Sequence, residues 1–323
     1  MHHKEIENLI EQTLKENPCE LDLRRNEQMN KHTTFKVGGP ADFYLRPAGD
    51  GFPGFCAGLL SRARCQRVPV FILGGGANIV VSDKGIRGIV LDTGAWNSIK
   101  PQKDGEENGI VFCSGMTLDR AVEYAVNAEF SGLEFLAGMP GTVGGALWMN
   151  ARCYGREIAD VLAWADVLDY GGKNKEHAIT RIFTKADKAG FDYKISPFQG
   201  KEQLILSACF NLKKDDKTKI KTEMKKNKQD RKEKGHYLFP CAGSAFKNNR
   251  NFGKPSGQII DELGLKGFSV GGAEVASFHG NILINTGGAT ANDIRTLMDN
   301  ITAKVKAATG FILEPEILFV GES

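Results

Sequence analysis

Residues Gly132–Gly155 read GLEFLAGMPGTVGGALWMNARCYG, the most informative stretch of this chain. The stretch holds six glycines and one proline among small and apolar residues. An ordinary helix is not built this way, because each interior glycine costs about 1 kcal/mol relative to alanine. Glycine at this density suits a backbone that approaches a ligand closely and points its N–H groups at it. We therefore expect a ligand-binding loop here.

The glycine content of the whole chain supports this view. The chain has 323 residues, of which 38 are glycine. That is about 12%, whereas about 7% glycine is usual in proteins. The excess is clustered at 74–76, 138–145, 271–272 and 287–288, which indicates ligand loops rather than disorder. The length allows two or three domains, and 41% hydrophobic and 25% charged residues are typical of a globular protein.

Charge and cysteine content exclude several classes of protein. A net charge of +3 is too small to indicate nucleic-acid binding. The seven cysteines include no CxxC pair, so we expect free thiols in a reducing cytosol and no metal site. No signal-peptide core and no apolar run of about 18 residues is visible. We therefore expect a cytoplasmic protein without membrane insertion.

Periodicity and turn residues predict a mixed α/β order of elements. Helices are expected at 4–16, 117–128, 213–234, 256–263 and 291–309. Strands are expected at 33–37, 41–45, 69–73, 79–83, 89–93, 109–114, 161–169, 203–211, 281–285 and 311–320. The lysine-rich segment 213–234 is expected to join two domains.

The first glycine loop lies between two predicted strands and comprises Gly74, Gly75, Gly76, Ala77 and Asn78. It differs from a Rossmann loop, in which the glycines open a helix, and it lacks the lysine of a P-loop. Successive N–H groups in such a turn can form a nest for a pyrophosphate, and Asn78 adds a donor. A plain tight turn is an equally good interpretation of this loop alone.

The second glycine loop lies inside the opening stretch. We expect Pro140 in the first turn of a helix, a hydroxyl from Thr142, and a helix start that approaches a phosphate closely. A close crossing of a helix and a strand is the alternative. Two such loops predict a large phosphate-bearing ligand, and a dinucleotide fits. The candidate ligand residues of this loop are Gly138, Met139, Pro140, Gly141, Thr142, Gly144 and Gly145.

Two polar positions stand out near the C-terminus. Gly243 would allow a bend after the Pro240–Ala242 turn and expose the hydroxyl of Ser244, a plausible proton donor; a capping or turn serine is the common alternative. Glu314 and Glu316 lie within the apolar run FILEPEILFV and would share one face of a strand. Buried carboxylates would suit proton transfer, whereas an edge strand at Pro315 would leave both in water.

Together these motifs resemble the UDP-N-acetylenolpyruvoylglucosamine reductases of bacterial peptidoglycan synthesis. The resemblance is carried by LGGGANIVVSD, GLEFLAGMPGTVGGALWMNARCYGREI, GSAFKN and LEPE, and extends from about Asn30 to the C-terminus. It implies an α+β fold, with a two-subdomain FAD-binding module of the vanillyl-alcohol-oxidase (PCMH) type and a C-terminal α/β substrate-binding domain. It also implies non-covalent FAD between two domains, NADPH as reductant, and the shorter type of chain in this family.

The predicted domain boundaries follow from this resemblance. Residues 1–28 would be a lead-in, 29–98 and 99–212 the two FAD subdomains, and 213–323 the substrate-binding domain. The last strand, near 311–323, is expected to return to the first subdomain.

The resemblance also assigns roles to residues. Ser244 would protonate the intermediate after hydride transfer from flavin N5 to the enol carbon, and Glu316 would be the catalytic glutamate. The family arginine that binds the enolpyruvyl carboxylate is replaced by Lys194, which keeps the charge but loses the bidentate fork. Either Lys194 acts as a point charge, or Arg156 or another cation takes over. By the same resemblance, Asn150 binds the cofactor, and the substrate is contacted by Tyr154, Tyr193, Lys234 and Asn248.

The expected reaction is reduction of UDP-N-acetylglucosamine enolpyruvate to UDP-N-acetylmuramate. Another FAD-dependent oxidase or dehydrogenase of the same fold is the alternative, and GSAFKN and LEPE argue against it. Nucleic-acid binding through 213–234 is a third interpretation. That segment has no aromatic residues, and acids at 215, 216, 223, 230 and 233 dilute its basic charge, which favours a solvated linker helix.

Overall fold

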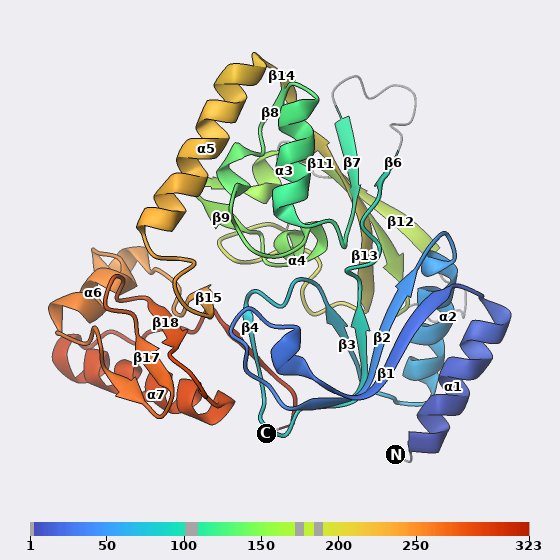
Figure 1. The fold of residues 1–323 in the computed structure, drawn as a ribbon, viewed down its shortest axis with the longest axis horizontal. Coiled ribbons are helices and arrows are strands. Elements are labelled where there is room, and N and C mark those ends of the chain that lie inside the picture. Colours follow the sequence, from blue (N-terminus) through green and yellow to red (C-terminus); the bar gives the residue numbers. More distant parts are fainter. Residues whose placement is uncertain (1–2, 101–108, 172–177, 184–189, 323) are drawn as a thin grey trace. The chain divides into compact units, whose positions relative to one another are not determined.

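The computed structural model describes residues 3–100, 109–171, 178–183 and 190–322. The chain forms two compact units. Unit 1 comprises residues 1–25, 42–75 and 88–228, and unit 2 comprises residues 26–41, 76–87 and 229–323. The ribbon in Figure 1 follows the chain through both units. The chain passes between the units several times, once between Gly75 and Gly76 in the first glycine loop.

A four-stranded sheet with two helices lies mainly in unit 1. Its strand order is β1-β2-β5-β3, and α1 and α2 pack together (Figure 1). Helix α1 forms because Ile6, Leu9 and Ile10 recur at helical spacing and are buried. These residues share a core with aromatic side chains of β2 and α2. The element bounds are α1 His3–Glu16, β1 Glu20–Gln28, β2 Pro40–Ala48, α2 Phe52–Cys65, β3 Val70–Leu73 and β5 Ile86–Asp92.

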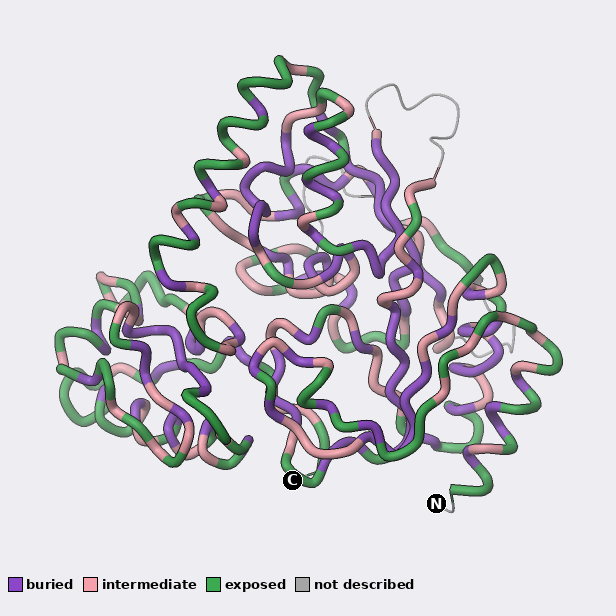
Figure 2. The backbone as a smooth tube through the Cα atoms, in the orientation of Figure 1, coloured by how far each residue is buried: buried purple, intermediate pink, exposed green. Residues whose placement is uncertain are grey.

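A second, antiparallel sheet in unit 1 has the order β12-β11-β13-β7-β6. Strands β7, β11 and β13 of this sheet are mostly buried (Figure 2), and their side chains share a core with α3 and α4. Helix α3 begins where the Thr117 hydroxyl accepts the N–H of Arg120. The sheet strands are β6 Ile99–Lys100, β7 Gly109–Cys113, β11 Leu162–Asp169, β12 Ala178–Phe183 and β13 Gln203–Asn211. The helices are α3 Leu118–Asn127, η2 Glu134–Leu136, α4 Val143–Trp148 and η3 Ile158–Asp160.

Two short strand pairs and a long helix complete unit 1 and lead into unit 2. Strands β9 (Arg152–Cys153) and β10 (Arg156–Glu157) pair with each other, as do β8 (Phe130–Ser131) and β14 (Lys213–Lys214). Helix α5 (Lys217–Glu233) is largely exposed (Figure 2). The expected charged helix is confirmed, and the chain enters unit 2 after Lys228.

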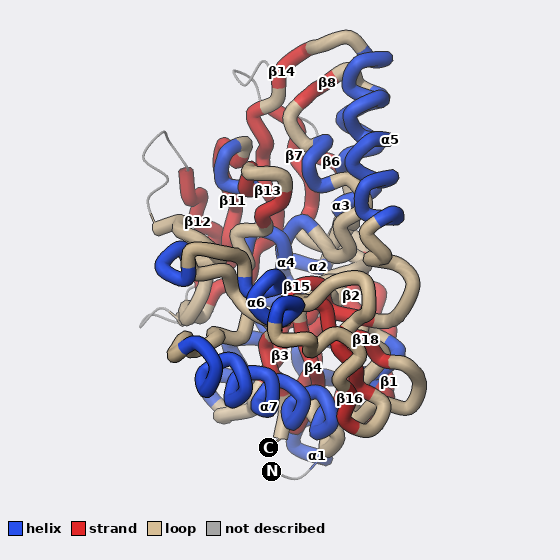
Figure 3. Tube along the Cα trace, turned by 90° about the vertical axis from the view of Figure 1, so that its left-hand side faces the viewer, coloured by secondary structure: helices blue, strands red, loops and turns tan. Residues whose placement is uncertain are grey.

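Unit 2 is built around a sheet of order β15-β18-β17-β16 and the helices α6 and α7 (Figure 3). Helix α7 begins with a capping box between Thr290 and Asp293 and ends at Gly310 in a left-handed conformation. A parallel pair, β19 and β4, completes the unit, so the last strand pairs with a strand from the N-terminal third of the chain. The bounds are η1 Met29–Lys31, β4 Ile79–Val81, β15 Cys241–Ser244, η4 Arg250–Phe252, α6 Ser256–Glu262, β16 Ser269–Val270, β17 Ala273–Val275, β18 Ile282–Asn285, α7 Ala291–Thr309 and β19 Leu318–Val320.

The structure confirms an α+β fold and most predicted elements, and corrects three. Residues 33–37 form a turn rather than a strand, with Lys36 at a φ of +54°. Residues 240–242 are not a turn, because strand β15 begins at Cys241. The strand expected over 311–320 is limited to β19, and Pro315 makes only an isolated bridge with Phe246, since proline has no N–H for a ladder.

Candidate active site

The two glycine loops meet within unit 1. A Cβ atom added to Gly75 would lie 2.5 Å from Cα of Gly141, and one added to Gly74 would lie 2.7 Å from Oγ1 of Thr142. Only glycine permits backbones to approach this closely. The sequence predicted both loops but not their contact. The contact makes one cradle from two segments that lie far apart in the chain.

The first glycine loop carries N–H groups that the protein does not use. Among the described residues, the N–H groups of Gly75, Gly76 and Ala77 have no acceptor. Consecutive donors of this kind suit a phosphate. Gly76 lies in unit 2, where a Cβ would be 2.1 Å from the carbonyl oxygen of His32. Asn78 donates to the carbonyl oxygen of Glu316 at 3.0 Å, so one of its N–H groups holds the C-terminal segment.

The start of helix α4 is used differently from the expectation. Pro140 precedes Thr142, the N-cap residue, so its predicted place in the first helical turn is wrong. The N–H groups of Val143 and Gly144 donate to Met116 and Ser114 of unit 1, and the N–H of Gly145 donates to the Thr142 hydroxyl. These first-turn donors therefore hold the helix in place. At the start of α4, glycine therefore allows a ligand to approach the backbone closely, but the N–H groups of Val143, Gly144 and Gly145 are already bonded within the protein.

The rest of the second loop is held by its neighbours. The N–H of Gly138 donates to Oδ1 of Asp119 at 2.8 Å, and the N–H of Met139 donates to the carbonyl oxygen of Leu136. Gly138 and Gly141 have φ angles of +74° and +121°, which side-chain-bearing residues rarely adopt. The loop is therefore shaped by its own backbone before any ligand binds.

Two buried polar atoms near α4 lack partners. The side-chain oxygens Oδ1 of Asn150 and Oγ of Ser114 are buried and have no hydrogen-bond partner among the described residues. Asn150 is fully buried with a φ of +44°, and its amide nitrogen donates to the carbonyl oxygen of Asp192 at 2.8 Å. Unsatisfied buried polar atoms are rare. A polar ligand such as FAD would satisfy them, so the residues present fit this cofactor.

The predicted proton donor and glutamate lie in one segment pair of unit 2. The N–H of Glu316 donates to the carbonyl oxygen of Ala245 at 2.8 Å, and the N–H of Lys247 donates to that of Glu314 at 2.8 Å. The backbone of GSAFKN therefore pairs with LEPE and places Glu316 beside Ala245, the residue after Ser244. Ser244 ends strand β15, and its hydroxyl has no hydrogen-bond partner in the described chain.

The two carboxylates of LEPE lie in different environments. Glu316 is 8% exposed. The side chain of Glu314 is 68% exposed and forms an ion pair of 2.5 Å with Lys247. Pro315 forms an isolated bridge with Phe246, and of the two carboxylates only that of Glu316 is buried.

Sequence reasoning missed Asn281, which holds the Ser244 segment. Its side chain is 2% exposed, accepts the N–H of Phe246 at 2.9 Å and donates to the carbonyl oxygen of Phe246 at 2.8 Å. The carbonyl oxygen of Asn281 accepts the N–H of Ala245. A lone asparagine at the start of a predicted strand has no local signal for this role.

The residues predicted to contact the substrate are divided between unit 1 and unit 2. In unit 1, the Tyr154 hydroxyl donates to the carbonyl oxygen of Asn227 at 3.2 Å, and Lys194 has a φ of +59°. In unit 2, Lys234 forms an ion pair with Asp230 at 2.8 Å, and Oδ1 of Asn248 accepts the N–H of Ser256. Tyr193 lies beside Lys194, whose Nζ is 6.0 Å from the ring centroid.

A pair of histidines in unit 2 was also missed. Burial, followed by the charges of Arg231 and His279, lowers the pKa of His236 to about 4. Burial likewise lowers the pKa of His279, whose Nδ1 accepts the N–H of Asn281. Both imidazoles are therefore neutral at pH 7.

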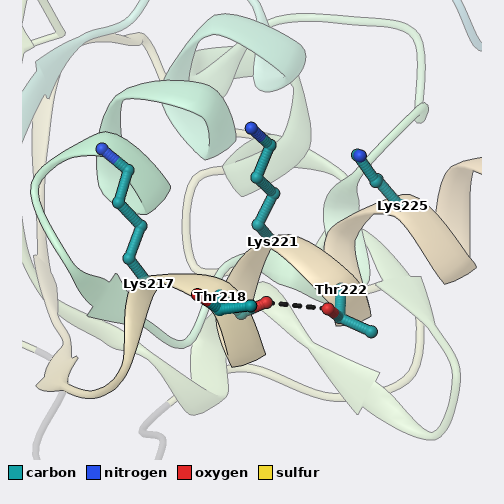
Figure 4. A pocket seen from close by; sticks show the side chains of 5 residues that line it. All are labelled: Lys217, Thr218, Lys221, Thr222 and Lys225. Carbon is teal, nitrogen blue, oxygen red and sulfur yellow. Dashed lines mark hydrogen bonds between the residues drawn. The ribbon is translucent and has the colours of Figure 1, made fainter.

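A separate surface pocket lies on α5 and contains none of the predicted site residues. Figure 4 shows Lys217, Lys221 and Lys225 pointing to one side of the helix, with Thr218 and Thr222 between them. Other lysines of this helix form ion pairs with acids, such as Lys228 with Asp119 and Glu123. This arrangement is typical of a solvated helix face.

The remaining structural observations concern cysteines, metals and membranes. All seven cysteines are unpaired, which agrees with the expectation of free thiols. No group of three or more metal-ligating side chains occurs in the part of the chain that the structure describes. Within that part, helices long and apolar enough to cross a membrane are also absent.

The glycine cradle and its unsatisfied polar atoms define an FAD-binding protein, and residues 56–176 match the FAD binding domain model. Residues 234–320 match the model of the UDP-N-acetylenolpyruvoylglucosamine reductase C-terminal domain. The chain belongs to the UDP-N-acetylenolpyruvoylglucosamine reductase family, as the following relatives show.

The relatives match over nearly their whole length. The chain is 43% identical to the UDP-N-acetylenolpyruvoylglucosamine reductase of Borrelia garinii subsp. bavariensis, over 92% of this chain and 93% of the relative. It is 39% identical to that of Treponema denticola, over 90% and 91%. The crystal structure of UDP-N-acetylenolpyruvylglucosamine reductase from Thermus caldophilus superposes with a TM-score of 0.72 at 29% identity, covering 94% of this chain and all of the other.

Proposed function

We propose that this protein is an enzyme that reduces UDP-N-acetylglucosamine enolpyruvate to UDP-N-acetylmuramate, with FAD as cofactor and NADPH as reductant. This step supplies a precursor of peptidoglycan, and we place it in the cytoplasm. The observation that carries the proposal is the pairing of GSAFKN with LEPE, within the region that matches the family's C-terminal domain. The FAD binding domain match and the relatives support it.

The cofactor residues are proposed from the glycine cradle. Gly74–Asn78, Gly138–Gly145 and Asn150 would hold FAD. When bound, FAD would supply the redox chemistry, which moves a hydride from NADPH to the terminal enol carbon of the substrate. The protein supplies geometry, charge and the proton. We propose residues 29–98 and 99–212 as the FAD subdomains and 213–323 as the substrate-binding domain.

The proton-transfer role falls to Ser244. Hydride addition to the enol carbon leaves negative charge on the carbon next to the carboxylate, delocalised as an enolate. The Ser244 hydroxyl has no protein partner among the described residues, so it can donate its proton to that carbon. Gly243, at a φ of +73°, precedes Ser244, and Asn281 holds the backbone of Ala245 and Phe246 that follows it.

The enolate requires groups that stabilise its charge before the proton arrives. Lys194 would provide a positive charge from unit 1. In its protonated form, the buried carboxyl of Glu316 would donate a hydrogen bond. Tyr154, Tyr193, Lys234 and Asn248 are proposed to contact the rest of the substrate.

The test follows NADPH and the enolpyruvyl substrate separately. The purified protein is expected to be yellow, to be bleached anaerobically by NADPH, and to regain colour when the substrate is added. Mass spectrometry should identify UDP-N-acetylmuramate. A protein that cannot be reconstituted with FAD would contradict the proposal. Reduced protein that reacts with oxygen but ignores the enolpyruvyl substrate would favour the alternative, an oxidase of the same fold.

A further inference from the structure

Two basic side chains of unit 1 share one aromatic ring. The guanidinium carbon of Arg152 lies 5.8 Å from the centroid of the Tyr193 ring, and Nζ of Lys194 lies 6.0 Å from it. Such distances are at the limit of a cation–π contact. Arg152 comes from β9 and Lys194 from a turn some forty residues later in the chain. The fold therefore brings two cations to one place.

Hydrogen bonds hold these two segments together. The amide of Asn150 donates to the carbonyl oxygen of Asp192 at 2.8 Å. Nε2 of Gln199 donates both to the carbonyl oxygen of Trp148 at 2.8 Å and to that of Lys194 at 3.1 Å. The residues just before Arg152 are thus tied to the turn that carries Lys194. These bonds from the Asn150 and Gln199 side chains to backbone carbonyls hold the two segments that carry Arg152 and Lys194 next to each other.

The guanidinium of Arg152 is not neutralised by the protein. In the hairpin of β9 and β10, Arg152 lies opposite Glu157. That glutamate instead takes part in a capping box with Asp160. Among the described residues, Arg152 forms no ion pair with a carboxylate. A half-buried, uncompensated arginine is well suited to bind an anion from outside the protein.

Backbone strain is concentrated in the same segments. Asn150, Tyr154 and Lys194 have φ angles of +44°, +52° and +59°. Left-handed conformations in residues other than glycine cost free energy and gather at functional sites. Asn150 also has a buried oxygen without a partner. These observations point to a ligand beside Arg152.

We infer that Arg152, together with Lys194, binds the carboxylate of the enolpyruvyl group, an inference that rests on the proposed function. A planar guanidinium donates two parallel hydrogen bonds to a carboxylate, whereas an ammonium acts as a point charge. Arg152 therefore supplies the fork that Lys194 lacks. The same contact strengthens as negative charge develops beside the carboxylate.

Arg156 is the rival cation and provides a matched control. Its guanidinium carbon lies 4.9 Å from the centroid of the Phe135 ring, so it stacks on a different aromatic residue. Arg152 and Arg156 lie on the two strands of one short hairpin. Replacing either removes the same charge from the same hairpin. Only the Arg152 replacement removes a positive charge that lies beside the Tyr193 ring.

The experiment measures the two half-reactions of Arg152→Ala, Arg156→Ala and the unmodified holoenzyme by anaerobic stopped-flow absorbance. We expect Arg152→Ala to keep its FAD and its rate of reduction by NADPH. Its reoxidation by the enolpyruvyl substrate should lose roughly 10- to 100-fold in kcat/KM, the cost of charge-assisted hydrogen bonds. Arg152→Lys should lose less, and Arg156→Ala should resemble the unmodified enzyme. Adding Lys194→Arg to Arg152→Ala should restore most of the loss.

Inhibition by UDP-N-acetylglucosamine, which lacks the carboxylate, separates recognition from general damage. Arg152→Ala should leave this inhibition unchanged, because the nucleotide and sugar contacts remain. Equal weakening of inhibitor and substrate would overturn the inference, as would a normal reoxidation rate in Arg152→Ala. Loss in Arg156→Ala alone would assign the role to Arg156. An unmodified holoenzyme that NADPH reduces but the substrate does not reoxidise would overturn the proposed function as well.

Discussion

The backbone N–H of Glu316 donates to the carbonyl oxygen of Ala245 at 2.8 Å. This bond joins two segments from opposite ends of the C-terminal region, because Ala245 follows β15 and Glu316 precedes β19. Ser244 directly precedes Ala245, so this bond fixes the backbone next to it. The side chain of Asn281 fixes Phe246, on the other side of Ala245, through two hydrogen bonds. The relationship gives the proposed acid and hydroxyl a common backbone support.

Replacing Ser244 with alanine should separate the two half-reactions. Removal of a positioned proton donor slows a reaction by roughly 100- to 10,000-fold, so reoxidation by substrate should fall by that range. Reduction by NADPH should stay nearly unchanged. Stopped-flow absorbance of the flavin measures both rates. Ser269→Ala, an exposed serine in the same sheet, is the control. Equal losses in both half-reactions would contradict the proton-donor role.

Replacing Asn281 with alanine should damage both stability and the second half-reaction. Each lost buried hydrogen bond leaves a partner unsatisfied at about 1–3 kcal/mol, and the two side-chain bonds to Phe246 would both be lost. Urea unfolding should show the destabilisation, and the substrate rate constant should fall more than the rate of reduction by NADPH. The exposed Asn292→Ala should change the free energy of unfolding by at most about 0.5 kcal/mol. A stable, fully active Asn281→Ala would refute the positioning role.

Two glycine replacements distinguish packing within the cradle from contact with the cofactor. Gly75→Ala should disturb the protein itself, because its Cβ would meet Cα of Gly141 at 2.5 Å; we expect about 1–3 kcal/mol of destabilisation and weak FAD binding. Gly145→Ala has room, since its Cβ would lie 3.5 Å from Oγ1 of Thr142.

Thermal unfolding of the FAD-free protein and FAD titration test this pair of variants. The FAD-free Gly145→Ala protein should be at least as stable as the unmodified one, because alanine favours a helix. Its affinity for FAD should nevertheless fall if the start of α4 approaches the cofactor. Normal FAD affinity in Gly145→Ala would remove this helix from the proposed cofactor contacts.

Acid should destabilise the protein through His236. Its folded pKa of about 4 lies below the ordinary value of 6.5, so the unfolded chain binds a proton more readily. The stability linked to this histidine is complete above pH 6.5 and is lost as the pH falls toward 4. His279, whose pKa is lowered by burial, should act in the same direction.

Urea midpoints between pH 7 and pH 4 measure this effect. The positive groups that oppose protonation of His236 are Arg231, His279 and Lys234, while Asp230 favours it. His236→Gln should flatten the decline between pH 6.5 and 4. An identical decline in His236→Gln would show that other groups cause it.

Local signals were sufficient for most elements. A helix was predicted at 117–128, and the structure shows α3 at Leu118–Asn127 with Thr117 as its N-cap. The failure at 33–37 has a clear reason. Phe35 and Val37 look like strand residues but are buried in the core of unit 2 from a turn. Tertiary packing overrode the strand propensity of these residues.

The sequence predicted residues of the candidate site only where they belong to short, unusual motifs. The glycine loops, Ser244 and Glu316 are visible as residue types in unusual places. Arg152 and Asn281 are ordinary in their local sequence. Their importance comes from contacts with Tyr193 and Phe246, which no spacing rule reveals.

The amino-acid sequence alone established the order of elements, the two glycine loops and the family, because short-range sterics, capping and residue type act within a few positions. The three-dimensional fold established that Gly75 meets Gly141, that Glu316 is buried while Glu314 is solvated, and that Arg152 joins Lys194. Those relationships depend on which distant segments pack together. Burial and pairing are properties of the packed chain, so the same residue types in sequence leave them open.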